Sequence, residues 1–75
     1  MPWTARDLRV VLVRAGFVEL RQRGSHLRLG RTDPSGERRY VTLPIHGGDI
    51  PAGTLRAILR EAGLSEDDAR RLLRG

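Results

Sequence analysis

The spacing of the apolar residues changes twice along this 75-residue chain, and this change constrains the fold more than any other feature. Residues 4–15 and 51–63 carry apolar side chains at the three- and four-residue intervals of an amphipathic helix. Between them, residues 17–43 alternate apolar and polar side chains, as half-buried strands do. A chain this short predicts one small domain, residues 1–75, with a thin core.

Capping and turn signals give the bounds of these elements. Thr4 with Asp7 forms a capping-box pair at the start of the first helix, and Ser65 with Asp68 starts a short C-terminal helix. Turns rich in glycine and proline separate three strands, which we expect at residues 17–23, 26–31 and 37–43. The sequence therefore predicts an α+β fold of order α-β-β-β-α, with a three-stranded antiparallel sheet and a short C-terminal helix.

Strand parity assigns the side chains to two faces of this sheet. We expect both long helices on one face, because each has an apolar stripe to bury. The apolar side chains assigned to the helix-covered face are Val18, Leu20, Leu27, Leu29, Val41 and Leu43. The open face receives Arg21, Arg23, His26, Arg28, Arg38, Tyr40 and Thr42. Arg39 has the opposite parity and is expected toward the helices or at the sheet edge.

The basic residues are all arginines, fourteen against nine acidic residues, and the net charge is +5. Six of these arginines lie in residues 17–46 against three acidic residues, so the positive charge concentrates on the sheet. Guanidinium groups match phosphate oxygens in pairs, and an excess of positive charge on a small domain is typical of a polyanion partner.

The stretch Gly24-Ser25-His26 is the candidate catalytic motif. Histidine titrates near neutral pH, so it both accepts and donates protons. Among arginines on an open face, His26 suits a general base or acid in RNA strand scission. The alternative is a strand-edge histidine that only caps a turn. His46, beyond the third strand, is either a second proton-transfer group or an exposed loop residue.

The other polar groups near this motif are candidates for RNA contact. Ser25 is better explained as a turn residue with a hydroxyl near phosphate than as a nucleophile, because no acid is placed to orient His26. Tyr40 either stacks on a base or packs across the strands. The candidate RNA- or phosphate-binding residues are Gly24, Ser25, Arg21, Arg23, Arg28, Arg38, Tyr40 and His46.

Several classes of site find no support in the sequence. There is no cysteine, and two histidines twenty residues apart match no zinc spacing, so we expect no metal and no cofactor. No segment approaches the ~20 apolar residues of a membrane span, and the N-terminus has no signal-peptide pattern. We therefore expect a cytoplasmic protein with metal-independent chemistry and no membrane partner.

An ordered set of motifs extends from about Thr4 to Ser65. It consists of Ala15-Gly16-Phe17, Gly24-Ser25-His26, Val41-Thr42-Leu43-Pro44 with His46, Gly53-Thr54-Leu55-Arg56-Ala57-Ile58-Leu59-Arg60 and Ala62-Gly63-Leu64-Ser65. In this order and spacing the chain resembles the HicA toxin family. One departure is Leu27-Arg28-Leu29, where many relatives have another histidine or an aromatic residue.

The resemblance implies a fold like that of double-stranded-RNA-binding domains and a ribonuclease that cleaves mRNA and arrests growth. It implies a HicB-type antitoxin that blocks the active site, and His26 as the catalytic histidine of a metal-independent enzyme. Two alternatives stay open. A non-catalytic RNA-binding module of the same fold would bind RNA without cutting it, and an interaction protein would act mainly through its partner complex.

Overall fold

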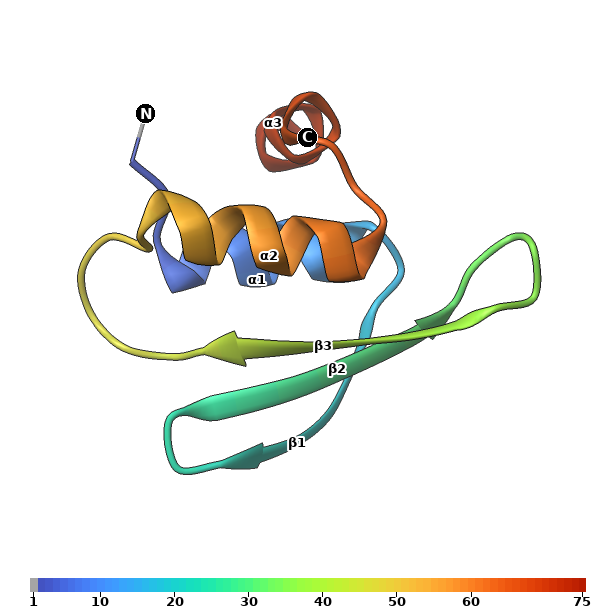
Figure 1. Ribbon diagram of the computed structural model, residues 1–75, viewed down its shortest axis with the longest axis horizontal. Helices are drawn as coiled ribbons and strands as arrows, with labels where there is room; N and C mark the ends of the chain where they lie inside the picture. Colours follow the sequence, from blue (N-terminus) through green and yellow to red (C-terminus); the bar gives the residue numbers. More distant parts are fainter. Residues whose placement is uncertain (1) are drawn as a thin grey trace.

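The computed structural model describes residues 2–75. Its elements are α1 (Ala5–Arg14), β1 (Val18–Arg23), β2 (His26–Thr32), β3 (Arg38–Pro44), α2 (Ala52–Ala62) and α3 (Glu66–Arg74). The strands form an open antiparallel sheet in the order β1-β2-β3, and the helices lie on one side of it (Figure 1). The predicted α+β fold is confirmed, with α3 packed mainly against α1. In the described part of the chain, no helix is both long and apolar enough to cross a membrane.

Both predicted capping boxes are present. The Thr4 hydroxyl accepts from the Asp7 amide, and the Asp7 carboxylate accepts from the Thr4 amide, each at 3.1 Å. At α3, Ser65 and Asp68 make the same two hydrogen bonds at 3.0 and 3.2 Å. Because the first backbone N–H groups of a helix lack partners within it, these side chains fix where α1 and α3 begin.

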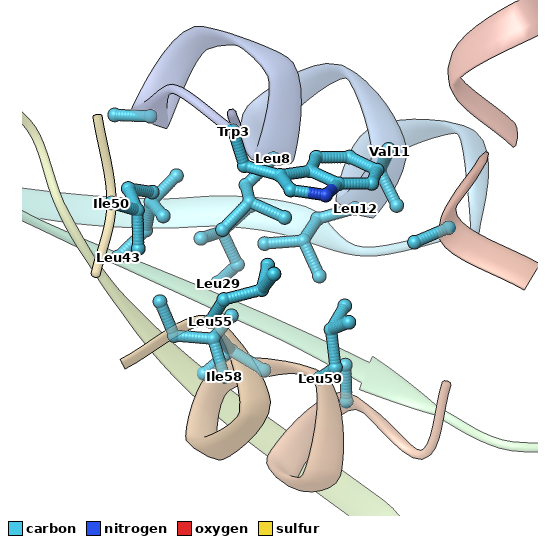
Figure 2. Close-up of a cluster of buried hydrophobic side chains, with 14 of the residues drawn as sticks. Trp3, Leu8, Val11, Leu12, Leu29, Leu43, Ile50, Leu55, Ile58 and Leu59 are labelled. Carbon is cyan, nitrogen blue, oxygen red and sulfur yellow. The ribbon is translucent and has the colours of Figure 1, made fainter. Parts of the chain in front are cut away.

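The core lies between the helix layer and the sheet, and side chains from α1, α2, β2 and β3 meet there (Figure 2). Leu8, Val11 and Leu12 of α1 and Leu29 of β2 are fully buried. Trp3 lies over α1 toward Val11 in Figure 2 and is also buried. Its carbonyl accepts from the Ile50 amide at 2.7 Å, so the N-terminal segment is held against the loop before α2.

The predicted face assignment is wrong for the start of β1. A β-bulge lies between Glu19 and Arg21, where the register against β2 shifts by one residue. Every residue of β1 is exposed, including Val18 and Leu20, which the alternation had assigned to the core. Cross-strand partners share a face, so Glu19, opposite Leu29, points to the helix side. There its carboxylate binds the Arg9 guanidinium of α1 at 2.5 and 2.7 Å.

An arginine side chain from another element donates a hydrogen bond to the C-terminal end of each helix. Arg31 donates to the carbonyl of Ala15 at the end of α1, and Arg39 to that of Glu61 near the end of α2, at 3.5 Å. Arg14 donates to the carbonyls of Leu72 and Leu73 at 2.7 and 3.0 Å. The last carbonyls of a helix lack partners and carry the negative end of its dipole, so these guanidinium groups stabilise all three ends. Arg39 thus points toward the helices, as its parity predicted.

Candidate nucleic-acid interface

His26 is the first residue of β2, directly after a two-residue turn from β1. Gly24 in this turn has φ +55°, in the left-handed region that glycine adopts without strain. The tight turn sets His26 opposite Arg23 on one side and opposite Pro44 of β3 on the other. The exposed imidazole therefore lies at one end of the middle strand, between two neighbouring strands.

A shallow hollow on the open face surrounds this imidazole. It has a volume of about 240 Å³ and is lined by Arg21, Arg23, His26, Arg28 and Thr42. We call it the His26 hollow. Its residues come from all three strands, and the pairs Arg21–Arg28 and Arg28–Thr42 lie directly opposite each other across the sheet. The structure therefore brings together three of the sequence-predicted arginines and the candidate catalytic histidine.

The arginines of the hollow differ in how firmly they are held. The Arg28 guanidinium donates to the Thr42 hydroxyl at 2.8 Å and lies 4.9 Å from the centroid of the Tyr40 ring. Within residues 2–75, no side-chain hydrogen bond or ion pair holds Arg21 or Arg23, and every ion pair involves arginines outside the hollow. The hollow is thus positively charged, with one oriented guanidinium and two side chains free to reorient.

Tyr40 and Arg38 lie farther along the open face, outside the lining of the hollow. Arg38 donates to the Tyr40 hydroxyl at 3.5 Å and to the Thr32 hydroxyl at 3.3 Å, and its guanidinium is 5.3 Å from the Tyr40 ring centroid. Tyr40 therefore contacts two guanidinium groups, those of Arg28 and Arg38. Through Arg28 it adjoins the hollow, and through Arg38 it extends the positive surface toward the β2–β3 turn.

The structure places His46 near the hollow without including it. The backbone amide of Ile45 donates to the carbonyl of Ser25 at 2.6 Å, so the loop after β3 lies against the turn before His26 (Figure 1). His46 follows in this loop, exposed, with Nδ1 3.1 Å from the carbonyl of Gly47. Gly24 and Ser25 form the turn at the same end of the sheet but do not line the hollow either.

The residue that sequence reasoning left out of the candidate set is Thr42. Parity predicted only that Thr42 lies on the open face. In the structure Thr42 also lines the hollow and accepts a hydrogen bond from Arg28. The signal in the sequence was its position two residues after Tyr40, which gives both side chains the same face. What parity does not give is register, and only register shows that Thr42 lies opposite Arg28.

At the far end of the sheet, the β2–β3 turn is organised by the Asp33 carboxylate. One oxygen accepts from the Ser35 hydroxyl at 2.6 Å and from the amides of Ser35 and Glu37, and the other accepts from Arg39 at 2.9 Å. These hydrogen bonds, that of the Ser35 hydroxyl first, lower the pKa of Asp33 to about 2, although desolvation opposes the shift. The turn is therefore held by an ionised carboxylate over most of the pH range.

Metal ligands do not gather around the hollow. Within residues 2–75, no three side chains of histidine, cysteine, aspartate or glutamate lie close enough together to bind one metal ion. The hollow instead presents one imidazole and several guanidinium groups. Because guanidinium groups donate in pairs to phosphate oxygens, this set of groups suits the binding of a phosphate anion.

Comparison with known proteins agrees with the motifs read from the sequence. No curated protein matches the chain. A family model, described as the HicA toxin of bacterial toxin–antitoxin systems, matches residues 5–64, from the start of α1 to just beyond α2. This match includes the whole sheet and the His26 hollow, and covers well over half of the 75 residues. The chain therefore belongs to the HicA toxin family of bacterial toxin–antitoxin systems.

Proposed function

We propose that this toxin is an endoribonuclease that cleaves mRNA in the cytoplasm without a metal ion, with His26 as its proton-transfer group. The observation that carries the proposal is the His26 hollow. Its imidazole is exposed and, within residues 2–75, makes no hydrogen bond, so it is available to a substrate. Around it are three guanidinium groups without carboxylate partners in the same part of the chain.

The chemistry follows from these groups. The neutral imidazole of His26 accepts the proton of a ribose 2′-hydroxyl, whose oxygen then attacks the adjacent phosphorus. A 2′-O–P bond forms and the P–O5′ bond breaks, which gives a 2′,3′-cyclic phosphate and a 5′-hydroxyl end. The leaving 5′-oxygen takes a proton from water or from a second acid, for which His46 is the candidate. Negative charge grows on the phosphate oxygens during the attack, and the guanidinium groups stabilise it.

The arginines have different roles in this mechanism. Arg28 is oriented before substrate arrives, because the Thr42 hydroxyl and the Tyr40 ring both hold its guanidinium. A donor that is already oriented loses no free energy to reorganisation when charge develops, so Arg28 is the group best suited to the transition state. Arg21 and Arg23 supply charge that attracts the RNA and binds its phosphates.

The test is RNA cleavage in EDTA by the wild-type toxin, by His26→Ala and by His46→Ala. We expect His26→Ala to lower the rate roughly 10²- to 10⁴-fold, as loss of a general acid or base does. His46→Ala tests the second proton transfer, because His46 is the other exposed imidazole at this end of the sheet. Slower cleavage by His46→Ala would assign it the proton of the leaving 5′-oxygen, and cleavage at the wild-type rate would leave that proton to water. Equal cleavage by wild type and His26→Ala would exclude His26 as the proton-transfer group.

A second function is favoured by the same open face. Four exposed or half-buried arginines on it, Arg21, Arg23, Arg28 and Arg38, would bind RNA whether or not His26 cuts it. In that case wild-type toxin would shift RNA in a gel, with strong salt dependence, and leave it intact. This outcome would identify a non-catalytic RNA-binding module.

The family implies an antitoxin partner, and we propose that a HicB-type protein covers the open face. Acidic side chains of such a partner would neutralise the arginines of the His26 hollow, which have no carboxylates of their own within residues 2–75. Expression of the toxin alone should then arrest growth, and co-expression of the antitoxin should restore it. Full toxicity of His26→Ala would instead indicate an interaction protein that acts without cleavage.

A further inference from the structure

Apolar side chains gather on the open face beside the His26 hollow. In residues 2–75 four large apolar residues are clearly exposed, namely Val18 at 62%, Leu20 at 45%, Tyr40 at 45% and Val13 at 49%. Val13 belongs to α1, whereas the other three share the sheet face opposite the helices. Isolated exposed apolar residues are common, but three on one face next to a charged hollow indicate a binding surface.

The β1 bulge creates this surface. Gln22 lies opposite Leu27 and therefore faces the helices. If β1 alternated regularly from Gln22 back to Val18, Leu20 and Val18 would face the helices as well. The extra residue before Arg21 turns Val18 to the face of its partner Gly30 instead. Bulges of this kind are common beside active sites, where they redirect side chains.

Gly30 is the centre of this surface. A Cβ atom there would lie 3.1 Å from Leu20 Cδ1, 3.1 Å from Arg38 Nη2 and 3.2 Å from Tyr40 Cδ1. Side chains from β1 and β3 therefore lie directly over the bare backbone of β2, and Gly30 itself is buried beneath them. We call Val18, Leu20, Gly30 and Tyr40 the apolar patch.

The patch continues into the hollow through one residue. Arg28 lines the hollow and also contacts the Tyr40 ring. It precedes Gly30 by two residues on β2, which is about 7 Å along the strand. A ligand whose phosphate lies against Arg28 would therefore place its neighbouring chemical group on the patch.

On this basis we propose that the apolar patch binds an unpaired base of the RNA next to the scissile phosphate. The inference rests on the proposed ribonuclease function and names its substrate class, RNA that is single-stranded at the cleavage site. An unpaired base exposes a flat apolar face that stacks on aromatic and aliphatic side chains and on guanidinium planes, whereas a paired base hides that face in the duplex. The flanking Arg28 and Arg38 favour a polyanion over a neutral apolar partner.

The experiment begins with an RNA oligonucleotide in which the wild-type cut has been mapped. A 2′-deoxy substitution at the cut nucleotide makes it uncleavable, and abasic substitutions remove one base at a time on either side. Binding is measured by fluorescence anisotropy for wild type, Leu20→Ser and Val18→Ser. Val13→Ser is the matched control, because the exposed fraction of Val13 is close to that of Leu20 but Val13 lies on α1. Circular dichroism checks that each variant is folded.

We expect Leu20→Ser to weaken binding roughly five- to tenfold, in the range of the loss of one stacked base, and Val13→Ser to change it little. One abasic position should weaken wild-type binding by a similar factor but weaken Leu20→Ser much less, because the two changes remove the same contact. Base-pairing that nucleotide within a hairpin should slow wild-type cleavage at least about tenfold.

The other results would overturn the inference. Purely additive effects of the abasic and patch substitutions would show that no base lies on the patch. A loss of antitoxin binding by Leu20→Ser and Val18→Ser with unchanged RNA binding would assign the patch to the protein partner. If wild type cuts RNA but cuts paired and unpaired sites equally, only this inference fails. If wild type neither binds nor cuts RNA, the proposed function fails together with it.

Discussion

Two pairs of arginines face each other across the strands of this sheet, on opposite faces. Arg31 of β2 lies opposite Arg39 of β3 on the helix side, and Arg28 lies opposite Arg21 of β1 on the open side. Like charges directly opposite each other in an antiparallel sheet are destabilising. The two pairs therefore pose the same electrostatic problem in two environments.

Within residues 2–75, only the helix-side pair has a carboxylate partner. On the helix side, Arg31 donates to the carbonyl of Ala15, and Arg39 binds the Asp33 carboxylate at 2.9 Å. On the open side, within residues 2–75, the pair has no carboxylate, and Arg28 has only the Thr42 hydroxyl and the Tyr40 ring. Within residues 2–75 the helix-side pair has carboxylate partners on Arg39, although Arg31 Nε is buried without a hydrogen-bond partner. The open-side pair has no carboxylate partner in the same residues, so it is open to an external anion.

The largest effect we expect comes from removing the oriented member of the open-side pair. Arg28→Ala should lower kcat/KM for RNA cleavage about 100-fold or more, as loss of one charge-stabilising donor does. Its free energy of unfolding should fall by about 1 kcal/mol or less, because the change removes one hydrogen bond and one ring contact but also relieves the repulsion from Arg21. Single-turnover cleavage and urea unfolding measure the two quantities.

Arg56→Ala is the control for this prediction. It removes the same charge from the exposed surface of α2, outside the His26 hollow. If both variants lose the same activity, net charge rather than the local pair governs cleavage, and the contrast between the two faces has no functional meaning.

Much of this contrast could be predicted from strand parity alone. Arg28 and Arg38 alternate with the apolar residues of their strands, so they were expected on the open face, whereas Arg39 shares the parity of Val41 and points to the helices. Periodicity and capping boxes likewise predicted every helix and strand. These features depend on neighbours within a few residues, which the sequence contains directly.

The bulge and the hollow could not be predicted in this way. Leu20 is an ordinary strand residue, and nothing in its neighbourhood along the chain marks it as the extra residue in β1. The shift arises from pairing with β2, where Val18 lies opposite Gly30 and Arg21 opposite Arg28. The contact of Thr42 with Arg28 also depends on the register, so the sequence did not predict it. Parity therefore predicts which face a side chain takes, and only pairing shows which side chains meet.

A smaller effect, on the free energy of unfolding, should follow when acid protonates Asp33, the carboxylate that binds Arg39 on the helix side. The pKa of Asp33 is lowered to about 2, from an ordinary value near 3.8. A lowered pKa in the folded state adds stability that is fully present above the unfolded value and is lost as the pH falls toward the folded one. Wild type should therefore exceed Asp33→Asn in stability at pH 7, and the gap should close between about pH 4 and pH 2.

Urea unfolding of both proteins at pH 7, 4, 3 and 2 measures this gap. Taking the difference between the two proteins separates Asp33 from Glu19 and Asp68, whose pKa values are also lowered by their arginine and serine partners. A gap that stays constant down to pH 2 would show that the charge of Asp33 does not compensate the Arg31–Arg39 pair.

The smallest effect should have the opposite sign. Arg21→Gln removes one charge of the open-side pair. Within residues 2–75 the Arg21 side chain makes no hydrogen bond that this change would lose. The variant should therefore raise the free energy of unfolding by about 0.2–0.5 kcal/mol at low ionic strength. At about 1 M salt, where the Debye length is ~3 Å, the gain should disappear. Arg39→Gln should lower stability under both conditions, because it removes hydrogen bonds to Asp33 and Glu61. If Arg21→Gln lowered the free energy of unfolding at low salt, Arg21 would be a residue that stabilises the fold. Its charge would then not be an unfavourable one that only a bound anion such as RNA compensates.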